Sequence, residues 1–189
     1  HYVMTTKGNL IESNFFNTND SVGIIGHGMD GSKLSNALNE IGIKNISYDP
    51  FLDLENLCCI EDIKKCKLIS LHIPLTRNNA FPTINMIDDI FLEKLEANIL
   101  INTSRGGVIN EKDLNEALNK EIVFGAGLDV FDKEPPDKNN PLLKNNKVLL
   151  SPHAATFTKE CLENMSLETA QNIIDFFEGK IEKTKIVKL

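Results

Sequence analysis

A short glycine-rich turn holds the residues best suited to binding a phosphate-containing ligand, Gly26-His27-Gly28-Met29-Asp30-Gly31. In such a G-x-G-x-x-G turn the first glycine allows a tight reversal and the second lets the backbone approach a pyrophosphate. The third lets a helix pack closely on a strand. The N-terminus of the following helix adds N–H donors and a partial positive charge. The pattern therefore predicts a dinucleotide-binding turn.

A carboxylate follows this turn at the expected distance. Asp49 ends the next predicted strand, about 18 residues after the last glycine. At that position a carboxylate accepts hydrogen bonds from the adenosine ribose hydroxyls and repels a 2′-phosphate, which favours NAD over NADP. The alternative is that Asp49 only forms a turn before Pro50.

One residue of the glycine turn is unfavourable for this interpretation. Asp30 stands where an apolar residue would pack beneath the turn, and its negative charge lies near the expected diphosphate. Lys33 could offset that charge. We therefore expect an intact dinucleotide site in which Asp30 weakens binding.

Three polar segments follow later apolar runs: Asn102–Gly107, Asp129–Pro135 and Ser151–Thr156. The first contains Arg105, which with Arg77 makes up all the arginine of the chain. Lysine serves wherever only a positive charge is needed, so an arginine retained here indicates a need for its planar, bidentate group. In a doubly wound sheet the chemistry gathers outside the carboxyl ends of the strands. We expect all three segments at that edge.

Short apolar runs and amphipathic segments alternate along the chain. Strands are predicted at 22–25, 43–48, 68–73, 99–101, 123–128 and 148–150, and helices at 32–41, 87–95, 111–118 and 159–178. Such alternation is typical of βαβ units and predicts an α/β fold with a doubly wound, mainly parallel sheet of the Rossmann type. Residues 135–141, rich in Pro and Asn, are predicted to form a surface loop.

The composition excludes several classes of function. The chain has 189 residues, of which 41% are hydrophobic and 25% charged, and a net charge of −7. An acidic chain is unsuited to nucleic acid, and no apolar run has the roughly 18–20 residues that cross a bilayer. The start does not resemble a signal peptide. Cys58, Cys59, Cys66 and Cys161 form no CxxC pair and are interpreted as reduced, partly buried thiols.

Four motifs in order resemble one known family. They are LHIPLT at 71–76, NTSRGGVI at 102–109, GAGLDVFDKEP at 125–135 and SPHAAT at 151–156. Together they resemble the D-isomer-specific 2-hydroxyacid dehydrogenases, and the likeness covers nearly everything from Ser21 to Leu189. The long turn that precedes SPHAAT is similar to the branch of hydroxypyruvate and glyoxylate reductases and phosphoglycerate dehydrogenase.

The resemblance implies a catalytic triad of Arg105, Glu134 and His153. Arg105 would hold the carboxylate and carbonyl of a 2-oxo acid and polarise the carbonyl. His153 would donate a proton to the carbonyl oxygen as a hydride reaches the carbon. Glu134 would bond the second imidazole nitrogen, fix its orientation and raise its pKa. The alternatives are a structural ion pair for Arg105, a structural histidine and a solvated glutamate.

The resemblance also implies further contacts with NAD. Asp129 would lie beside the nicotinamide amide, unless it is only a cap or turn residue. Ile73 and Pro74 would line the adenine side, Thr103 and Ser104 the nicotinamide side, and Ala155 would leave room for the nicotinamide ring. We expect His72 to pack or to bond the backbone, and His27 to contribute only its backbone. No metal site is predicted, since the His and Asp residues do not cluster at ligand spacing.

The family pattern implies three regions. Residues 1–20 are interpreted as a linker or truncated lead-in, 21–155 as the NAD-binding domain, and 156–189 as a helix and tail returning to a substrate domain. We expect that N-terminal substrate domain to be largely absent from this sequence, which is interpreted as a fragment or, alternatively, as a naturally minimal protein. In either case we expect it to bind NAD(H) but to turn over slowly alone. The expected enzyme is cytoplasmic, acts on a small 2-oxo or 2-hydroxy acid, and is a homodimer.

Two other functions remain open from the sequence. One is a binding protein that senses NAD(H), similar to the corepressors with this fold, in which the dinucleotide switches the oligomeric state. The other is a plain Rossmann protein with incidental motif matches.

Overall fold

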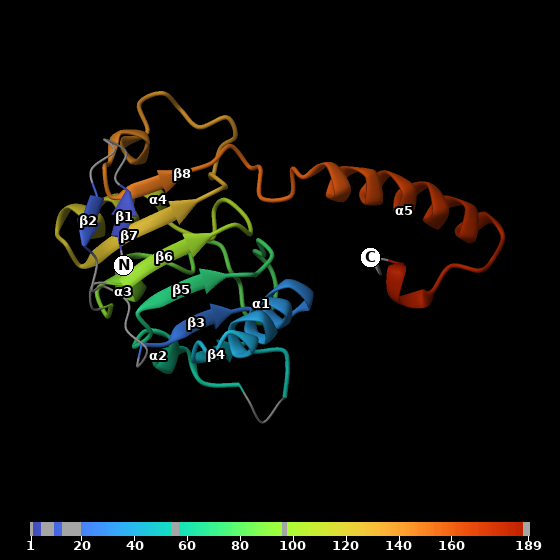
Figure 1. Ribbon diagram of the computed structural model, residues 1–189, viewed down its shortest axis with the longest axis horizontal. Helices are drawn as coiled ribbons and strands as arrows, with labels where there is room; N and C mark the ends of the chain where they lie inside the picture. Colours follow the sequence, from blue (N-terminus) through green and yellow to red (C-terminus); the bar gives the residue numbers. More distant parts are fainter. Residues whose placement is uncertain (1, 5–9, 13–19, 54–56, 96–97, 187–189) are drawn as a thin grey trace. The chain divides into compact units, whose positions relative to one another are not determined.

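A six-stranded parallel sheet runs through residues 22–150 (Figure 1). The computed structural model describes residues 2–4, 10–12, 20–53, 57–95 and 98–186. The strands lie in the order β4-β3-β5-β6-β7-β8, and every neighbouring pair is parallel. Their bounds are β3 Val22–Ile25, β4 Asn45–Tyr48, β5 Leu68–Leu71, β6 Asn98–Asn102, β7 Val123–Leu128 and β8 Val148–Leu150. The predicted doubly wound, Rossmann-type α/β fold is confirmed.

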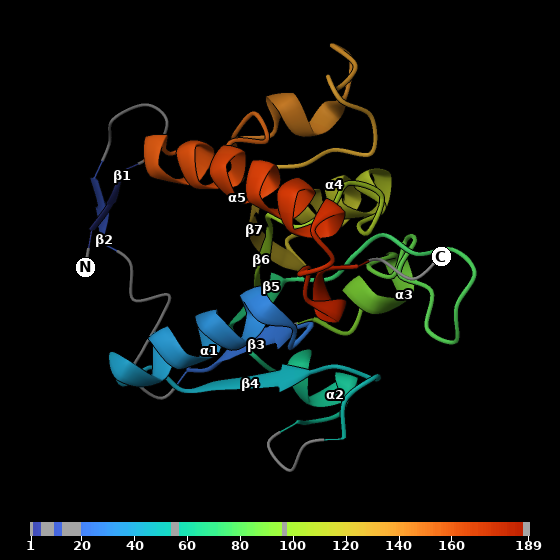
Figure 2. The same cartoon turned by 90° about the vertical axis from the view of Figure 1, so that its right-hand side faces the viewer.

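Within residues 20–152, helices cover both faces of this sheet (Figure 2). The α-helices are α1 Met29–Glu40, α2 Ile60–Ile63, α3 Asp89–Leu92, α4 Glu111–Asn119 and α5 Lys159–Phe177, and the 3-10 helices are η1 Pro141–Lys144 and η2 Lys183–Lys185. Side chains alternate between the faces of a strand, so Ile24 lies against Gly31 of α1 while Ile25 belongs to the core on the other face. That core also holds Ile63 of α2, Phe91 of α3 and Leu114 of α4.

Local hydrogen bonds set where the helices begin. The sequence predicts a helix from Ile87, but the Asp88 side chain accepts a bond from the Phe91 amide, so Asp88 is the cap and α3 begins at Asp89. Ile87 instead pairs with Ile109 in an isolated bridge. Asn110 caps α4 by accepting bonds from the amides of Lys112 and Asp113.

The structure contains short elements that the sequence does not predict. Strands β1 Tyr2–Met4 and β2 Leu10–Glu12 pair antiparallel within the segment interpreted as a lead-in. Helix α2 and the 3-10 helix η1 have four residues each, and η1 lies at the end of the predicted surface loop. Elements this short carry too few residues for a periodic pattern to be detected.

The cysteines are free thiols in the structure. Cys66 is buried, Cys58 and Cys161 are half-buried, and Cys59 is exposed. Burial raises the pKa of the Cys58 thiol to about 11, with a smaller contribution from the Asp62 carboxylate. A thiol with so high a pKa is almost entirely protonated at neutral pH and is a poor nucleophile.

The contacts divide the chain into two units, His1–Pro152 and His153–Leu189. The first contains the whole sheet with α1–α4, and the second contains α5 and η2. Helix α5 begins where the Thr158 hydroxyl accepts a bond from the Cys161 amide. The predicted boundary between residues 155 and 156 remains a prediction.

The core side chains of α4 give a test of this packing. Leu114 is fully buried, so Leu114→Ala should lower the free energy of unfolding by about 2–5 kcal/mol. Lys112→Ala changes an exposed residue of the same helix and should alter it by less than about 0.5 kcal/mol. Urea unfolding followed by circular dichroism measures both, and equal effects would contradict the assignment of this helix face.

Candidate functional site

The three glycines of the predicted dinucleotide turn have different surroundings. A Cβ on Gly26 would overlap the carbonyl oxygen of His72, and one on Gly31 would overlap the carbonyl oxygen of Gly26. Gly26 also has φ +95°, which L side chains rarely adopt. Around Gly28, by contrast, nothing lies within 4 Å of the Cβ position. Two glycines are therefore required for packing, whereas the second leaves space at the turn.

That space faces the start of α1. Gly28 is the N-cap of the helix and, as a glycine, supplies no side-chain cap to its first amides. The first amides of a helix point outward and carry a partial positive charge, so they suit an anionic group. Met29 and Asp30 are both exposed in this first turn. The open turn fits the pyrophosphate of a dinucleotide.

Asp49 lies beside the glycine turn. Its Oδ2 accepts a hydrogen bond from the His27 amide at 2.9 Å, and its Oδ1 accepts one from the Phe51 amide at 3.0 Å. The Gly26 amide donates to the carbonyl of Tyr48 at 2.8 Å. The end of β4 is thus fixed to the turn after β3, which places the predicted ribose-binding carboxylate next to the predicted phosphate site.

Two histidines, His27 and His72, lie near the glycine turn and contact neighbouring protein groups. The half-buried His72 has its Nε2 atom 2.9 Å from the Ser70 hydroxyl, so its hydrogen-bond partner there is a side chain. Burial lowers the pKa of His72, against the opposing effect of the Asp30 charge. His72 is therefore neutral at neutral pH. The backbone amide of His27 contacts Asp49, while its buried Nδ1 has no hydrogen-bond partner among the described residues.

The residues predicted on the adenine side begin the loop after β5. A Cβ on Gly26 would approach the Ile73 side chain at 2.7 Å, so Ile73 packs directly beneath the glycine turn. The carbonyl of Pro74 accepts a bond from the Thr83 hydroxyl at 2.6 Å. Thr76 and Thr83 also exchange bonds between their amides and hydroxyls. These bonds hold the loop closed.

Asn102, at the end of β6, fixes the turn that carries Arg105. Its side chain is buried; Oδ1 accepts bonds from the amide and hydroxyl of Ser104, and Nδ2 donates to the Arg105 carbonyl at 2.9 Å. Thr103 and Arg105 are exposed at this turn, and the Arg105 guanidinium donates to the Ser104 carbonyl at 2.6 Å. The Asn102 carbonyl accepts a bond from the Asp129 amide.

Gly106 brings this turn against the loop that carries Glu134. A Cβ on Gly106 would overlap the carbonyl of Phe131, so the two backbones touch. Gly107 has φ +76°, and its Cβ position lies 3.0 Å from the Asp132 carboxylate. Glu134 is exposed, and its Oε1 accepts a bond from the Phe131 amide at 3.1 Å. The structure therefore brings the segments of Arg105 and Glu134 together.

Asp129 is buried at the end of β7. Its Oδ1 accepts a hydrogen bond from the Ser151 hydroxyl at 2.5 Å. This bond joins the second and third polar segments. It also fixes the carboxylate that the sequence predicts beside the nicotinamide amide.

His153 is the first residue of the second unit, and Ala155 follows in the same unit. His153 has φ +53°, in the left-handed region that a non-glycine residue rarely adopts. Residues in this backbone region cluster at active sites and ligand-binding segments. Arg105 and Glu134 belong to the first unit, so the meeting of all three predicted catalytic residues stays a prediction.

The sequence analysis assigns no role to three residues that make hydrogen bonds in this region, Asn102, Ser151 and Glu111. Asn102 and Ser151 lie inside the quoted polar segments, and a polar residue closing an apolar run was the available signal. Glu111 accepts bonds from residues 21 and 29 positions later in the chain. No local pattern indicates such partners.

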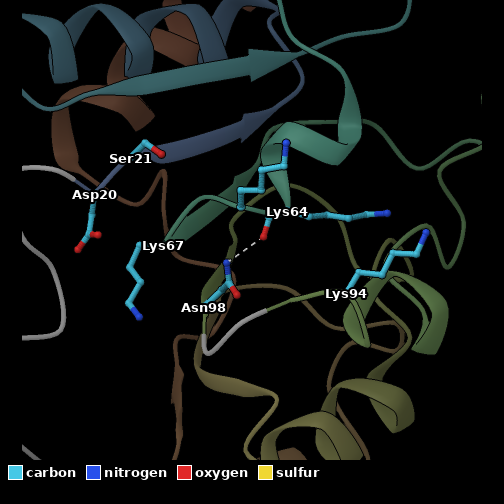
Figure 3. A pocket seen from close by; sticks show the side chains of 7 residues that line it. Asp20, Ser21, Lys64, Lys67, Lys94 and Asn98 are labelled. Carbon is cyan, nitrogen blue, oxygen red and sulfur yellow. Dashed lines mark hydrogen bonds between the residues drawn. The ribbon is translucent and has the colours of Figure 1, made fainter.

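A cavity of about 320 Å³ lies at the opposite edge of the sheet (Figure 3). Its lining includes residues at the amino ends of β3, β5 and β6, among them Ser21, Lys67 and Asn98. Three of its lysines already pair with carboxylates: Lys64 and Lys94 with Glu61, and Lys65 with Asp62. The ammonium groups of Lys67 and Lys94 point away from one another. The cavity is separate from the candidate site.

The described ranges contain no group of three or more side chains arranged to hold a metal ion. They also contain no helix with the length and apolar character that a membrane span needs.

The parallel sheet, the open glycine turn and the carboxylate beside it define a dinucleotide-binding domain. Residues 10–155 match the family described as D-isomer specific 2-hydroxyacid dehydrogenase, NAD binding domain. The chain belongs to this family, and its coenzyme is NAD, as the turn and Asp49 predict.

Relatives and solved structures agree with this assignment. The chain is 36% identical to a glyoxylate reductase of Korarchaeum cryptofilum, over 85% of this chain and 50% of the relative. It is 31% identical to D-3-phosphoglycerate dehydrogenase 3 of Arabidopsis thaliana, over 88% of this chain and 29% of the relative. The structure of D-lactate dehydrogenase with NAD+ from Lactobacillus jensenii has a TM-score of 0.81 at 27% identity, covering 97% and 61% of the two chains. The chain spans half or less of these two curated relatives.

Gly28 and Gly31 differ in the space around their Cβ positions, so alanine substitutions at the two form a matched pair of variants. Gly28→Ala should leave the free energy of unfolding within about 0.5 kcal/mol of the original, because its Cβ meets open space. It should weaken NADH binding about tenfold or more, because the methyl group occupies the pyrophosphate position. Gly31→Ala should instead cost about 3 kcal/mol of stability, because its Cβ overlaps backbone.

Urea unfolding and titration of NADH fluorescence separate these outcomes. Unchanged NADH affinity in Gly28→Ala would contradict the placement of the pyrophosphate at this turn.

Proposed function

We propose that this chain is the coenzyme-binding part of an NAD-dependent oxidoreductase that interconverts a small 2-oxo acid and its D-2-hydroxy acid. The main support is the backbone contact of Gly106 with Phe131, which joins the Arg105 turn to the Glu134 loop. Both segments follow the carboxyl ends of parallel strands, as the glycine turn does. Substrates of such sheets bind at that edge.

Arg105 is the proposed carboxylate-binding residue. The carboxylate and the neighbouring carbonyl of a 2-oxo acid lie in one plane, and the guanidinium can donate to both. Its positive charge also stabilises the negative charge that develops on the carbonyl oxygen. Asn102 fixes the backbone of this turn at the carbonyl of Arg105, while the guanidinium remains exposed.

His153 and Glu134 are the proposed proton-transfer pair. In the reducing direction the bound coenzyme would supply a hydride for the carbonyl carbon. His153 donates a proton from one imidazole nitrogen to the carbonyl oxygen, which becomes the hydroxyl of the product. Glu134 accepts a bond from the other nitrogen and stabilises the protonated ring. In the oxidising direction His153 removes the hydroxyl proton.

The relatives suggest which acids to test. They include glyoxylate reductases, a glycerate dehydrogenase and D-3-phosphoglycerate dehydrogenases. We propose a substrate in this range of short 2-oxo acids, such as glyoxylate or hydroxypyruvate. The family likeness also supports a homodimeric assembly and a cytoplasmic location as proposals.

Arg105 gives the most direct test, in the natural polypeptide that contains this chain. Arg105→Ala should lower kcat/KM for the 2-oxo acid about a hundredfold, because the loss of a bidentate charged contact costs about 3 kcal/mol. Arg105→Lys should recover little of it, since a point charge lacks the planar pair of donors. Arg77→Ala, at the exposed second arginine, is the matched control. Retained kcat/KM in Arg105→Ala would reject the assigned role.

The 189-residue chain alone gives a second test. It should bind NADH in a fluorescence titration, because the glycine turn and Asp49 lie within one unit. Its turnover of glyoxylate or hydroxypyruvate should be far below that of an ordinary dehydrogenase, because it spans half or less of the relatives compared above. Ordinary turnover by the isolated chain would contradict this expectation, and absence of NADH binding would contradict the proposed function.

A further inference from the structure

One carboxylate holds both ends of the loop that carries Glu134. Glu111 is the first residue of α4 and is half-buried. Its Oε1 accepts a hydrogen bond from the Asp132 amide at 2.7 Å, and its Oε2 accepts one from the Asn140 side-chain amide at 2.5 Å. Asp132 begins the loop and Asn140 ends it. Both bonds are short and involve a charged acceptor, so they are among the stronger kinds of hydrogen bond.

The far end of the loop is anchored to the core. The Oδ1 atom of Asn140 accepts a bond from the Leu142 amide at 3.0 Å and caps η1. Leu142 is fully buried. The side chain of Asn140 therefore connects the core, through η1, to the carboxylate of Glu111.

The near end of the loop is fixed against the Arg105 turn. Asp132 follows Phe131, whose carbonyl contacts Gly106, and the Asp132 carboxylate lies close to the Cβ position of Gly107. Glu134 is two residues further along, and its carboxylate accepts a bond from the Phe131 amide. The backbone on which Glu134 stands is thus held by Glu111 and by the glycine contact.

We propose that Glu111 is a positioning residue for the reaction, acting through Glu134 by closing the 132–140 loop. The inference rests on the proposed function, because it assumes that Glu134 acts on the proton-donating histidine. Glu111 does not contact substrate in this role. It fixes the place from which the Glu134 carboxylate reaches its partner, and small displacements of such groups lower the rate of the chemical step.

The test uses the natural polypeptide that contains this chain. Glu111→Ala should lower kcat about tenfold or more, while the KM for the 2-oxo acid and the affinity for NADH change less than about twofold. This split is expected because the loop positions a proton-transfer group and not the binding groups. A parallel fall in NADH affinity would indicate general loosening of the domain and would overturn the inference.

Exchange of donor and acceptor gives a rescue experiment. Glu111→Gln alone places an amide NH2 against the NH2 of Asn140, and Asn140→Asp alone places a carboxylate against that of Glu111, so each should lower kcat. The double variant restores the bond with its polarity reversed. The glutamine oxygen still accepts from the Asp132 amide, and aspartate still caps η1. It should recover kcat to within about threefold of the original.

Glu134→Gln, measured alongside, separates this inference from the proposed function. If Glu134→Gln leaves kcat unchanged, the assigned role of Glu134 fails and the inference fails with it. If Glu134→Gln lowers kcat but Glu111→Ala does not, only the inference is overturned. The inference is also overturned if the double variant fails to recover kcat although its free energy of unfolding in urea equals that of the original protein. The double variant Glu111→Gln with Asn140→Asp retains the local hydrogen bonds. It therefore tests the inference even if Glu111→Ala does not fold.

Discussion

The candidate site depends on the hydrogen bonds that the buried side chain of Asn102 makes to the turn after β6. Its oxygen and nitrogen atoms both bond to the turn that follows β6, and its backbone carbonyl holds the amide of Asp129 after β7. A buried amide left without partners would cost about 1–3 kcal/mol, so these bonds fix the turn as well as satisfy the side chain. Two strand ends are thereby joined through one residue.

Close backbone approach is the second constraint. Gly31 lies against the carbonyl of Gly26, and Gly106 lies against the carbonyl of Phe131. Each contact brings together segments that a side chain would hold apart. The first shapes the turn for the coenzyme, and the second brings the Arg105 turn beside the Glu134 loop. Close backbone approach at a glycine thus shapes both the turn after β3 and the turn after β6.

Much of the fold could be predicted because its strands are short apolar runs, the most deeply buried of which are β3 and β5. Continuous apolar runs such as 22–25 and 123–128 identify strands directly, and their alternation with helices implies a parallel sheet. The four-residue helix α2 and the paired strands β1 and β2 could not be predicted, because such short elements show no period. The start of α3 depends on a single capping bond from Asp88, which shifts the boundary by two residues.

The candidate site was predictable only in part, for a related reason. The glycine turn, Asp49 and Arg105 stand in local motifs, and their chemistry can be inferred from residue type and spacing. Glu111 does not, since its partners Asp132 and Asn140 become neighbours only after folding. The side chain of Ser151 likewise reaches Asp129 across 22 positions of sequence. Long-range bonds of this kind follow from the sheet order, which a sequence pattern indicates only indirectly.

The left-handed backbone of His153 has an energetic consequence. Such a conformation costs most L-residues about 1–2 kcal/mol, whereas glycine adopts it freely. Glycine at position 153 would adopt this backbone at no steric cost, so the imidazole stands there at the expense of folding free energy.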